Sequence, residues 1–187
     1  MRLPAFALLA SVVVGFGAEV KPFKWSGDLN VPDPTSVTFD EAGNAYVAST
    51  TRRKAGDLDI REHRLWIPDD VGLTSPADKL AFYQRELAPG KMKSGRGSLK
   101  DHNKDGSVDW KDLTFHQERI YKLTDTDRDG VADKITIFAE GFNSPVSGIA
   151  AGVLYFDGWV YLTAIPDVWR LKDTDGDGVA DLKDVIA

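Results

Sequence analysis

Asp125-Thr126-Asp127-Arg128-Asp129-Gly130-Val131-Ala132-Asp133 is repeated almost unchanged as Asp173-Thr174-Asp175-Gly176-Asp177-Gly178-Val179-Ala180-Asp181. The two stretches are identical at eight of nine positions, and the second begins 48 residues after the first. A self-similar period of about 40–50 residues is typical of repeat architectures, and the blades of β-propellers fall in this range. The repeat therefore predicts an all-β chain that is built from similar units.

Strand-like residues flank both copies of the repeat. Ile120–Thr124 precedes the first copy, Val168–Lys172 precedes the second, and Lys134–Phe138 follows the first. The alternating β-branched residues after the first copy predict a strand and not a helix. The twelfth position, which is usually Glu in an EF-hand, is Thr136 in one copy and Asp184 in the other. We therefore expect loops that join strands.

Each copy has carboxylates at its first, third, fifth and ninth positions and Gly at its sixth. Carboxylates at alternate positions of a tight turn converge on one side, and Gly adopts the backbone conformation that such a turn needs. Hard oxygen ligands at this spacing suit Ca²⁺. A solvated acidic turn is the alternative for a lone Asp-x-Asp, but two near-identical copies favour calcium. The predicted ligands are Asp125, Asp127, Asp129, Asp133, Asp173, Asp175, Asp177 and Asp181.

A third acidic loop occupies residues 101–112. Its alternating polar residues, apolar eighth residue and carboxylate at the twelfth position fit the spacing of an EF-hand-type calcium loop. A short helix over Trp110–His116 is expected to follow. The predicted ligands in this loop are Asp101, Asn103, Asp105, Asp109 and Asp112.

This third loop belongs to a segment, residues 51–118, that interrupts the strand pattern. Ser75 is the expected N-cap of a helix, with Pro76 at the first helical position and Asp78 at the third. Pro89-Gly90 is expected to end that helix. We therefore expect an insertion with one helix and one calcium loop. Its basic stretches, residues 52–54 and 91–100, are interpreted as solvated linkers in preference to anion-contacting loops.

Two hairpins are predicted outside the insertion, at Val37–Ala48 and Val153–Leu162. The second contains Asp157-Gly158 between apolar runs, a strong hairpin signal because a type I′ turn needs positive φ angles. Antiparallel hairpins with turn residues between them fit the blades of a propeller.

The N-terminal residues 1–18 predict a secretory signal peptide. Arg2 precedes the apolar run Leu3–Gly17, and small residues precede Glu19. The run is too short and too often interrupted by Gly to predict a membrane span, although a retained N-terminal anchor is the alternative. We expect residues 19–187 to be exported to the periplasm or the cell exterior. The membrane would be contacted only through an uncleaved signal segment.

Composition narrows the classes of function. The net charge is −6, and 12 of the 29 acidic residues lie in the three loops, which argues against nucleic-acid binding. The chain has no cysteine, so it has no disulfide framework and no Cys-ligated haem. His63, His102 and His116 have no ligand-like spacing, and we find no nucleophile elbow, phosphate-binding Gly loop or dinucleotide fingerprint.

Several stretches together resemble a known family. They are Val31–Asp40, Asp57–Arg61, the loop Asp101–Asp112 with the following Leu113–Tyr121, and the paired Asp-Thr-Asp loops. The pattern is similar to the N-terminal β-propeller of a family of membrane-bound dehydrogenases from planctomycetes and verrucomicrobia. That family is distantly similar to the PQQ-dependent glucose/sorbosone dehydrogenases.

The resemblance covers about residues 24–187 and implies a six-bladed propeller, of which this chain would hold about two to three blades. It implies an exported sugar or alcohol dehydrogenase-like protein with PQQ as cofactor and a cytochrome c module downstream. The PQQ-contacting residues would lie in later blades, so no catalytic residue is assigned. We also expect the last strand, Asp184–Ile186, to expose an unpaired edge. The alternative is a non-catalytic, calcium-stabilised propeller that serves as a binding or scaffold module.

Overall fold

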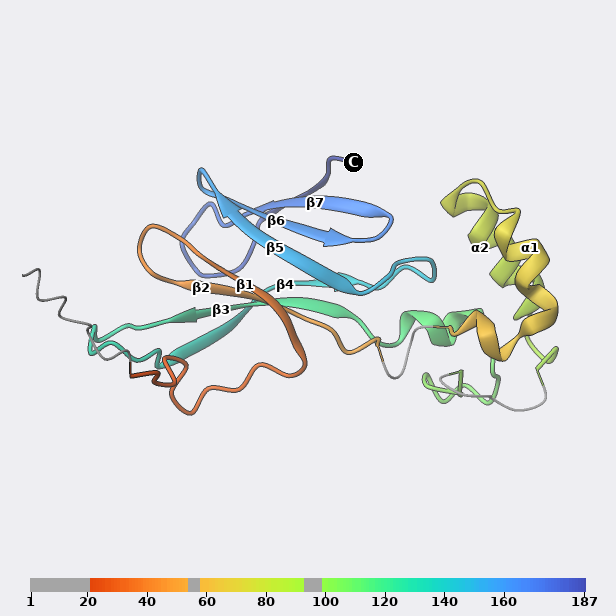
Figure 1. Cartoon of the computed structure of the whole chain (residues 1–187), viewed down its shortest axis with the longest axis horizontal. Coiled ribbons are helices and arrows are strands. Elements are labelled where there is room, and N and C mark those ends of the chain that lie inside the picture. The colour runs from red at the N-terminus through yellow and green to blue at the C-terminus, as the bar shows by residue number, and fades with distance from the viewer. Residues whose placement is uncertain (1–20, 54–57, 93–98) are drawn as a thin grey trace, which may run out of the picture.

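The computed structural model describes residues 21–53, 58–92 and 99–187 of a mostly β chain. Two four-stranded antiparallel sheets have the orders β1-β2-β3-β4 and β5-β6-β7-β8. Figure 1 shows the sheets together at one end of the molecule and the helices at the other. The strands are β1 (Pro34–Phe39), β2 (Ala45–Ser49), β3 (Glu118–Thr124), β4 (Lys134–Phe142), β5 (Ala150–Phe156), β6 (Trp159–Ala164), β7 (Asp167–Lys172) and β8 (Leu182–Val185).

The predicted signal peptide, residues 1–18, lies outside the described residues. Within the described ranges, no helix is both long enough and apolar enough to cross a membrane.

Both predicted hairpins are confirmed. Val37 of β1 pairs with Val47 of β2, and Tyr155 of β5 pairs with Val160 of β6. Asp157 and Gly158 connect β5 to β6 with φ angles of 49° and 76°, as a type I′ turn requires. The predicted strands on both sides of the first acidic loop are also confirmed, as β3 and β4.

Hydroxyl side chains of β1 hold the first sheet against β5 of the second. Ser36 Oγ accepts a hydrogen bond from the backbone N–H of Val153 at 2.7 Å, and Thr38 Oγ1 accepts one from Tyr155 at 3.1 Å. Thr35 Oγ1 donates to the carbonyl of Ala150 at 2.7 Å. These side-chain contacts replace a backbone ladder between the two strands. The sheets therefore stay separate but lie side by side along their first strands.

The main core lies between the two sheets. Its buried members include Tyr46, Ile120, Phe138 and Phe142 from the first sheet and Val160, Leu162 and Leu171 from the second. The Tyr46 ring meets Phe138 edge-on at 4.9 Å and stacks on Tyr155 at 5.8 Å. Because the alternating residues of each strand point to opposite faces, one face of each sheet supplies this core.

A buried carboxylate ties the sheets to the helical insertion. Glu118, at the start of β3, is 0% exposed. Its Oε1 accepts hydrogen bonds from Thr50 Oγ1 at 3.0 Å and from the N–H groups of Thr51 and Arg52 at 3.2 and 3.1 Å. Its Oε2 accepts one from the N–H of Ala150 at 2.6 Å, at the start of β5. The carboxylate thus joins the end of β2, the start of β3 and the second sheet.

The insertion forms a second small core around helix α2 (Pro76–Glu86). Ser75 is the N-cap, and its Oγ accepts the N–H of Asp78 at 3.1 Å, which confirms the predicted helix start. Buried Phe82, Tyr83, Leu87, Leu99 and Leu113 form the core. Leu80, on the same helix, is half-buried.

The insertion contains more helices than the sequence predicts. Besides α2 and the short helix expected over Trp110–His116, which is the 3₁₀ helix η3 (Trp110–Thr114), the α-helix α1 (Ile67–Val71) and the 3₁₀ helices η1 (Ile60–Glu62) and η2 (Arg64–Trp66) are present. None of these is longer than five residues, so none contains enough turns for a 3.6-residue period to show. The interpretation of Arg52 as part of a solvated linker was wrong, because this side chain is 1% exposed.

Replacing Glu118 by Gln should lower the free energy of unfolding by about 1–3 kcal/mol. The amide has only one acceptor oxygen, so its NH₂ group would face a backbone N–H and leave a buried donor without an acceptor. The midpoint of urea unfolding measures the effect.

Glu140→Gln is the matched control, because Glu140 forms a partly exposed ion pair with Arg119 at 2.8 Å. Such pairs contribute at most about 1 kcal/mol. Equal midpoints for the two variants would show that the Glu118 network does not stabilise the fold.

Candidate metal centre

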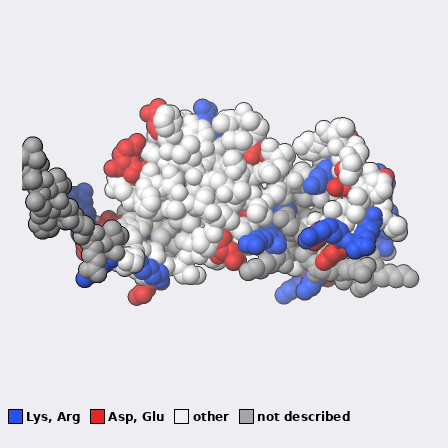
Figure 2. Space-filling view, in the orientation of Figure 1, with Lys and Arg blue, Asp and Glu red and all other residues white. Residues whose placement is uncertain are grey.

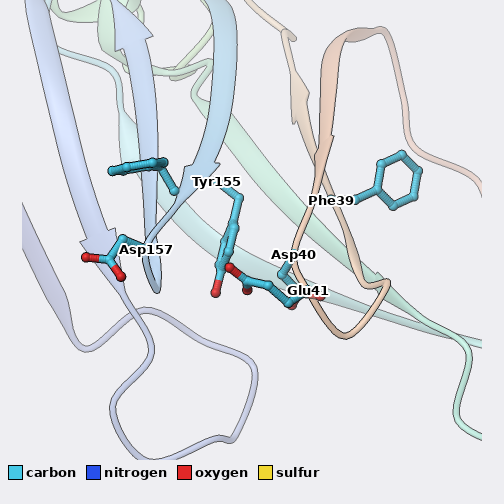
Figure 3. Close-up of a pocket in the computed structure, with 6 residues that line it drawn as sticks. Phe39, Asp40, Glu41, Tyr155 and Asp157 are labelled. Atoms are coloured by element: carbon cyan, nitrogen blue, oxygen red, sulfur yellow. The ribbon is translucent and has the colours of Figure 1, made fainter.

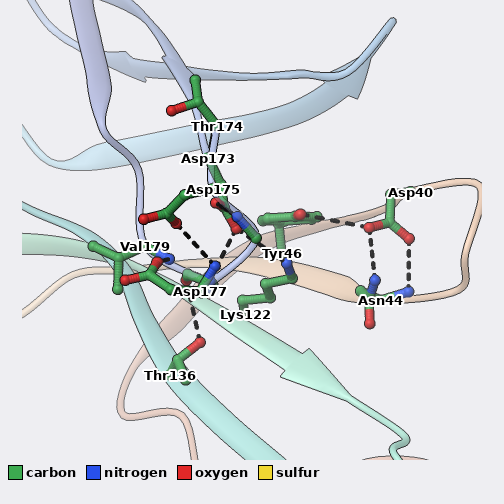
Figure 4. Close-up of polar contacts among 12 residues, drawn as sticks. Asp40, Asn44, Tyr46, Lys122, Thr136, Asp173, Thr174, Asp175, Asp177 and Val179 are labelled. Atoms are coloured by element: carbon green, nitrogen blue, oxygen red, sulfur yellow. Dashed lines mark hydrogen bonds and ion pairs between the residues drawn. The ribbon is translucent and has the colours of Figure 1, made fainter.

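The first three acidic positions of each repeated loop come together in space. One carboxylate oxygen from each of Asp125, Asp127 and Asp129 lies within 4.8 Å of the other two. The equivalent residues of the second loop, Asp173, Asp175 and Asp177, form the same group. Figure 4 shows the second group beside the strands of the first sheet. The structure thus assembles six of the predicted ligands into two triads.

Backbone N–H groups hold each triad in shape. The N–H of Gly130 donates to Asp125 Oδ2 at 2.9 Å, and that of Gly178 donates to Asp173 Oδ2 at the same distance. Both glycines have positive φ angles, 93° and 94°, which a residue with a Cβ rarely adopts. The carboxylate at position five of each loop likewise accepts a hydrogen bond from the backbone N–H of the residue at position seven. These donors orient the carboxylates and partly offset their mutual repulsion.

The carboxylates at position nine of the two repeated loops have a different role. Asp133 accepts hydrogen bonds from the N–H and the hydroxyl of Thr126 at 3.0 and 2.6 Å. Asp181 accepts the same two bonds from Thr174 at 2.6 and 2.7 Å. In this structure Asp133 and Asp181 therefore close their loops, and the triads do not include them. Their prediction as metal ligands stays a prediction.

The third loop follows the same hydrogen-bond plan with Asn in the third position. Gly106 N–H donates to Asp101 Oδ2 at 3.1 Å, as the sixth residue does in the other loops. Asp105 N–H donates to Asn103 Oδ1 at 2.9 Å, and Ser107 N–H donates to Asp105 Oδ1 at 2.8 Å. Asp101, Asn103 and Asp105 thus take the positions in the third loop that the triad residues take in the two repeated loops.

Asp109 and Asp112 close the third loop and begin the helix after it. Asp109 is the N-cap of η3 and accepts the N–H of Lys111 at 2.9 Å. Asp112 Oδ1 accepts the N–H groups of His102 and Asn103, and its Oδ2 accepts that of Asp109. Both side chains are buried. The short helix predicted after this loop is confirmed as a 3₁₀ helix. Its capping engages both oxygens of Asp112 and Oδ1 of Asp109, whereas Asp109 Oδ2 is buried without a hydrogen-bond partner among the described residues.

The second loop lies against the first sheet. The N–H of Ala180 donates to the carbonyl of Phe138 in β4 at 2.8 Å. Lys122 Nζ lies 3.7 Å from Asp173 Oδ2, and Figure 4 shows Tyr46 next to this pair. Burial raises the pKa of Tyr46, and the charges of Asp40 and Asp173 raise it further. The loop is therefore part of the junction between the two sheets.

The first loop makes the equivalent contact with the chain segment that precedes the first sheet. The N–H of Ala132, at the position of Ala180, donates to the carbonyl of Trp25 at 2.8 Å. Trp25, Leu29 and Val31 pack on the other face of the first sheet. Each repeated loop therefore fastens its own sheet to the chain segment on one side of it.

A separate pocket of about 420 Å³ lies between the tips of the two hairpins. Figure 3 shows the side chain of Glu41 beside the Tyr155 ring. A hydrogen bond with Glu41 is the main cause that raises the pKa of Tyr155. Asp40 is engaged in its own turn, where its Oδ1 accepts the N–H of Asn44 at 2.8 Å. The lining residues are Phe39, Asp40, Glu41, Tyr155, Phe156 and Asp157.

Sequence spacing did not indicate the pairing of two histidines. His116 Nε2 lies 3.3 Å from His102 Nδ1, and Phe115 packs against both rings. Burial lowers the pKa of His116, and the neighbouring charges of His102 and Arg52 lower it further. The two residues are 14 positions apart, and Asp112, in the segment between them, accepts the backbone N–H of His102 at 2.8 Å.

A family model for a domain of unknown function, DUF7133, matches residues 24–187. The chain belongs to this family. The matched range contains both sheets, the helical insertion and all three acidic loops, so these are parts of a DUF7133 domain. No curated protein and no solved structure matches the chain.

The threonines that close the repeated loops yield a pH prediction. Hydrogen bonds from Thr126 and Thr174 hold the pKa values of Asp133 and Asp181 below the ordinary 3.8. Because the folded pKa is depressed, this stabilisation is present above the unfolded pKa and is lost as the pH falls through the folded one. Thr126→Val should raise the pKa of Asp133, as followed by NMR of the carboxyl carbons.

Asp181 is the internal control in that titration, because its own Thr174 is intact in the variant. A Thr126→Val protein in which the pKa of Asp133 does not move would show that the threonine does not hold this carboxylate.

Proposed function

We propose that this chain is a calcium-binding, propeller-type β module in which the acidic loops act as structural clamps. The observation that carries the proposal is the common hydrogen-bond plan of the three loops. In each loop, the backbone N–H of the residue at position six donates a hydrogen bond to the side chain at position one. This turn leaves side-chain oxygens from positions one, three and five on one side. Loops far apart in the chain share this arrangement, which a generic acidic turn does not require.

The chemistry of the loops favours calcium over other common cations. All the side-chain donors at the three positions are carboxylate or amide oxygens, which are hard ligands that suit Ca²⁺ and Mg²⁺ and not soft metals. The third and fifth acids of the repeated loops are exposed, so water can complete the coordination. Ca²⁺ accepts such irregular shells of about six to eight oxygens, whereas Mg²⁺ demands a near-ideal octahedron.

Three features support the assignment of the two sheets as neighbouring propeller blades. Each sheet is a four-stranded meander in chain order. Their first strands, β1 and β5, lie side by side through Ser36, Thr38 and Thr35. The repeated loops join the last two strands of each sheet. The total of six blades stays a prediction from the family resemblance.

The dehydrogenase activity implied by that resemblance also stays a prediction. PQQ carries several carboxylates and is anionic at neutral pH. The hairpin-tip pocket is lined by Asp40, Glu41 and Asp157, so its residues do not fit this cofactor. The resemblance places the PQQ-contacting residues in later blades, so this pocket does not decide between the enzyme and the alternative of a calcium-stabilised binding or scaffold module. Dye reduction by the purified protein with PQQ and a panel of sugars and alcohols tests the enzymatic alternative.

Calcium should stabilise the folded protein through independent sites. Extracellular-type sites have Kd values of about 10⁻⁴–10⁻³ M. At about 1 mM Ca²⁺, each such site adds roughly 0.4–1.4 kcal/mol to the free energy of unfolding. Calorimetry should show three sites, and Asp129→Asn or Asp177→Asn should each remove one. Thermal unfolding with Ca²⁺, Mg²⁺ or chelator should rank calcium first.

Asp157→Asn is the matched control, because it removes the same charge from a turn outside the three loops. It should leave the stoichiometry at three and the calcium-dependent rise in melting temperature unchanged. If neither calcium nor chelator changes the melting temperature of the unmodified chain, the loops are acidic turns without a bound cation and the proposal is wrong. Two sites in place of three, with Asp129→Asn and Asp177→Asn each still removing one, would remove the Asp101–Asp112 loop from the proposal.

A further inference from the structure

The two repeated loops are nearly equal in sequence, but their surroundings differ. Apart from position four, which is Arg128 in the first loop and Gly176 in the second, the two nine-residue stretches are identical. The second loop has one additional contact, because a lysine of the first sheet reaches its carboxylate at position one. The charge close to the second triad therefore differs from the charge close to the first.

That lysine is Lys122 of β3, which the first sheet holds beside the second loop. Its Nζ lies 3.7 Å from Asp173 Oδ2 and 5.6 Å from the centre of the Tyr46 ring (Figure 4). The side chains of Lys122 and Asp173 are only 17% and 10% exposed. Because both groups are largely buried, water screens their attraction less than it screens an ion pair on the surface.

Two hydrogen bonds keep the second loop next to this lysine. The N–H of Ala180 donates to the carbonyl of Phe138 at 2.8 Å, and Thr136 Oγ1 donates to the carbonyl of Gly178 at 3.3 Å. Phe138 and Thr136 both belong to β4, the neighbour of β3 in the first sheet. The packing of the loop on this sheet therefore holds the ammonium close to the triad.

The first loop has a different neighbour. It is fastened to the carbonyl of Trp25, and within the described ranges its Asp125 forms no ion pair. The cation in its own sequence, Arg128, is an exposed residue, so water and salt screen its charge. The first loop is therefore an internal reference for the effect of Lys122 on the second.

We propose that Lys122 competes with calcium for the second loop and lowers the calcium affinity of this loop but not of the first. This inference rests on the proposed calcium function. An ammonium and a Ca²⁺ ion at the same carboxylate repel each other, and the repulsion is strong where water screens it poorly. Calcium that coordinates Asp173 also replaces the attraction of Lys122 for this side chain. A residue of one sheet thus tunes a cation site of the other.

The test follows the backbone amide NMR signals of Gly130 and Gly178 while calcium is added to the purified full chain. Each amide donates to the carboxylate at position one of its own loop, so each signal reports the occupancy of one loop. Lys122→Met keeps an unbranched apolar stem and removes the charge. It should lower the midpoint calcium concentration of the Gly178 signal about three- to tenfold and leave that of Gly130 unchanged.

Lys122→Arg keeps the charge, so both midpoints should stay near those of the unmodified chain. Circular dichroism melting verifies that the Lys122 variants are folded. A folded Lys122→Met protein whose second loop binds calcium more weakly would show that Lys122 only supports the packing, and this outcome would overturn the proposal.

Lys79→Met is the matched control. Lys79 Nζ lies at the same distance from a tyrosine ring, 5.6 Å from the centre of Tyr83. It belongs to α2, in the helical part of the molecule, where Figure 2 shows Lys and Arg gathered and which Figure 1 places away from the sheets. The variant loses the same charge and should leave both midpoints unchanged. Equal shifts of the Gly178 signal in Lys79→Met and Lys122→Met would indicate a general charge effect and overturn the proposal.

Two double variants separate this inference from the calcium proposal itself. Added to Asp177→Asn, whose second loop lacks a ligand, Lys122→Met should leave the Gly130 midpoint unchanged. Added to Asp129→Asn, it should still lower the Gly178 midpoint. An unchanged Gly178 midpoint there would overturn the role of Lys122 and leave calcium binding intact. If neither glycine signal of the unmodified chain responds to calcium, both the calcium proposal and this inference are wrong.

Discussion

The carboxylate of Glu118 is the contact on which the arrangement of this molecule depends. A buried charge is costly unless hydrogen bonds replace its hydration. Here four donors from two distant segments, Thr50–Arg52 and Ala150, surround a side chain that is 0% exposed. These hydrogen bonds replace the hydration that the charge loses on burial. The carboxylate therefore specifies where β2 ends, where β3 begins and where β5 enters the second sheet.

The same contact explains how a long helical insertion fits between two paired strands. β2 and β3 are antiparallel neighbours, although residues 50–117 separate them. Thr51 Oγ1 donates to the carbonyl of Gln117 at 2.8 Å, so the insertion leaves and returns at one point. With both ends tied, the helices form their own core around Phe82 and Leu87 without disturbing the ladder. Arg52, at the start of the insertion, is buried, and its Nη2 donates to the carbonyl of Leu113 at 3.1 Å.

The junction between the sheets combines apolar packing with contacts made by loops. Tyr46, Phe138 and Leu162 supply the buried apolar surface, and such surface is the main source of stability. Lys183 of β8 reaches back to the first sheet, where its Nζ donates to the Glu140 carbonyl at 2.6 Å. Its ammonium lies 3.8 Å from the Phe142 ring, and burial lowers its pKa. The second acidic loop lies at this junction, so a cation bound there would stabilise the contact between the sheets and not the loop alone.

The sequence by itself determined the features that depend on neighbouring residues. Alternation predicted β3 and β4, Asp157-Gly158 predicted a hairpin, and Ser75 predicted a helix cap, because each is set by backbone preferences over a few positions. The acidic loops were visible for the same reason: positions one, three and five of a tight turn converge whatever surrounds them. The roles of the carboxylates at loop positions nine and twelve were less predictable. Asp133 and Asp112 can each accept hydrogen bonds from nearby groups of the loop or bind a cation, and the sequence does not decide between the two.

Only the tertiary structure decided which distant segments meet. In the sequence, Glu118 falls at the end of the predicted insertion and Arg52 in a predicted basic linker, yet both side chains are buried. His102 and His116 become neighbours only through the folded loop between them. These contacts join positions that lie 14 or more residues apart, and they form only because burying the apolar faces of the strands brings those segments together. The pairing of the sheets and the burial of these charges therefore depend on long-range packing, which local sequence patterns do not encode.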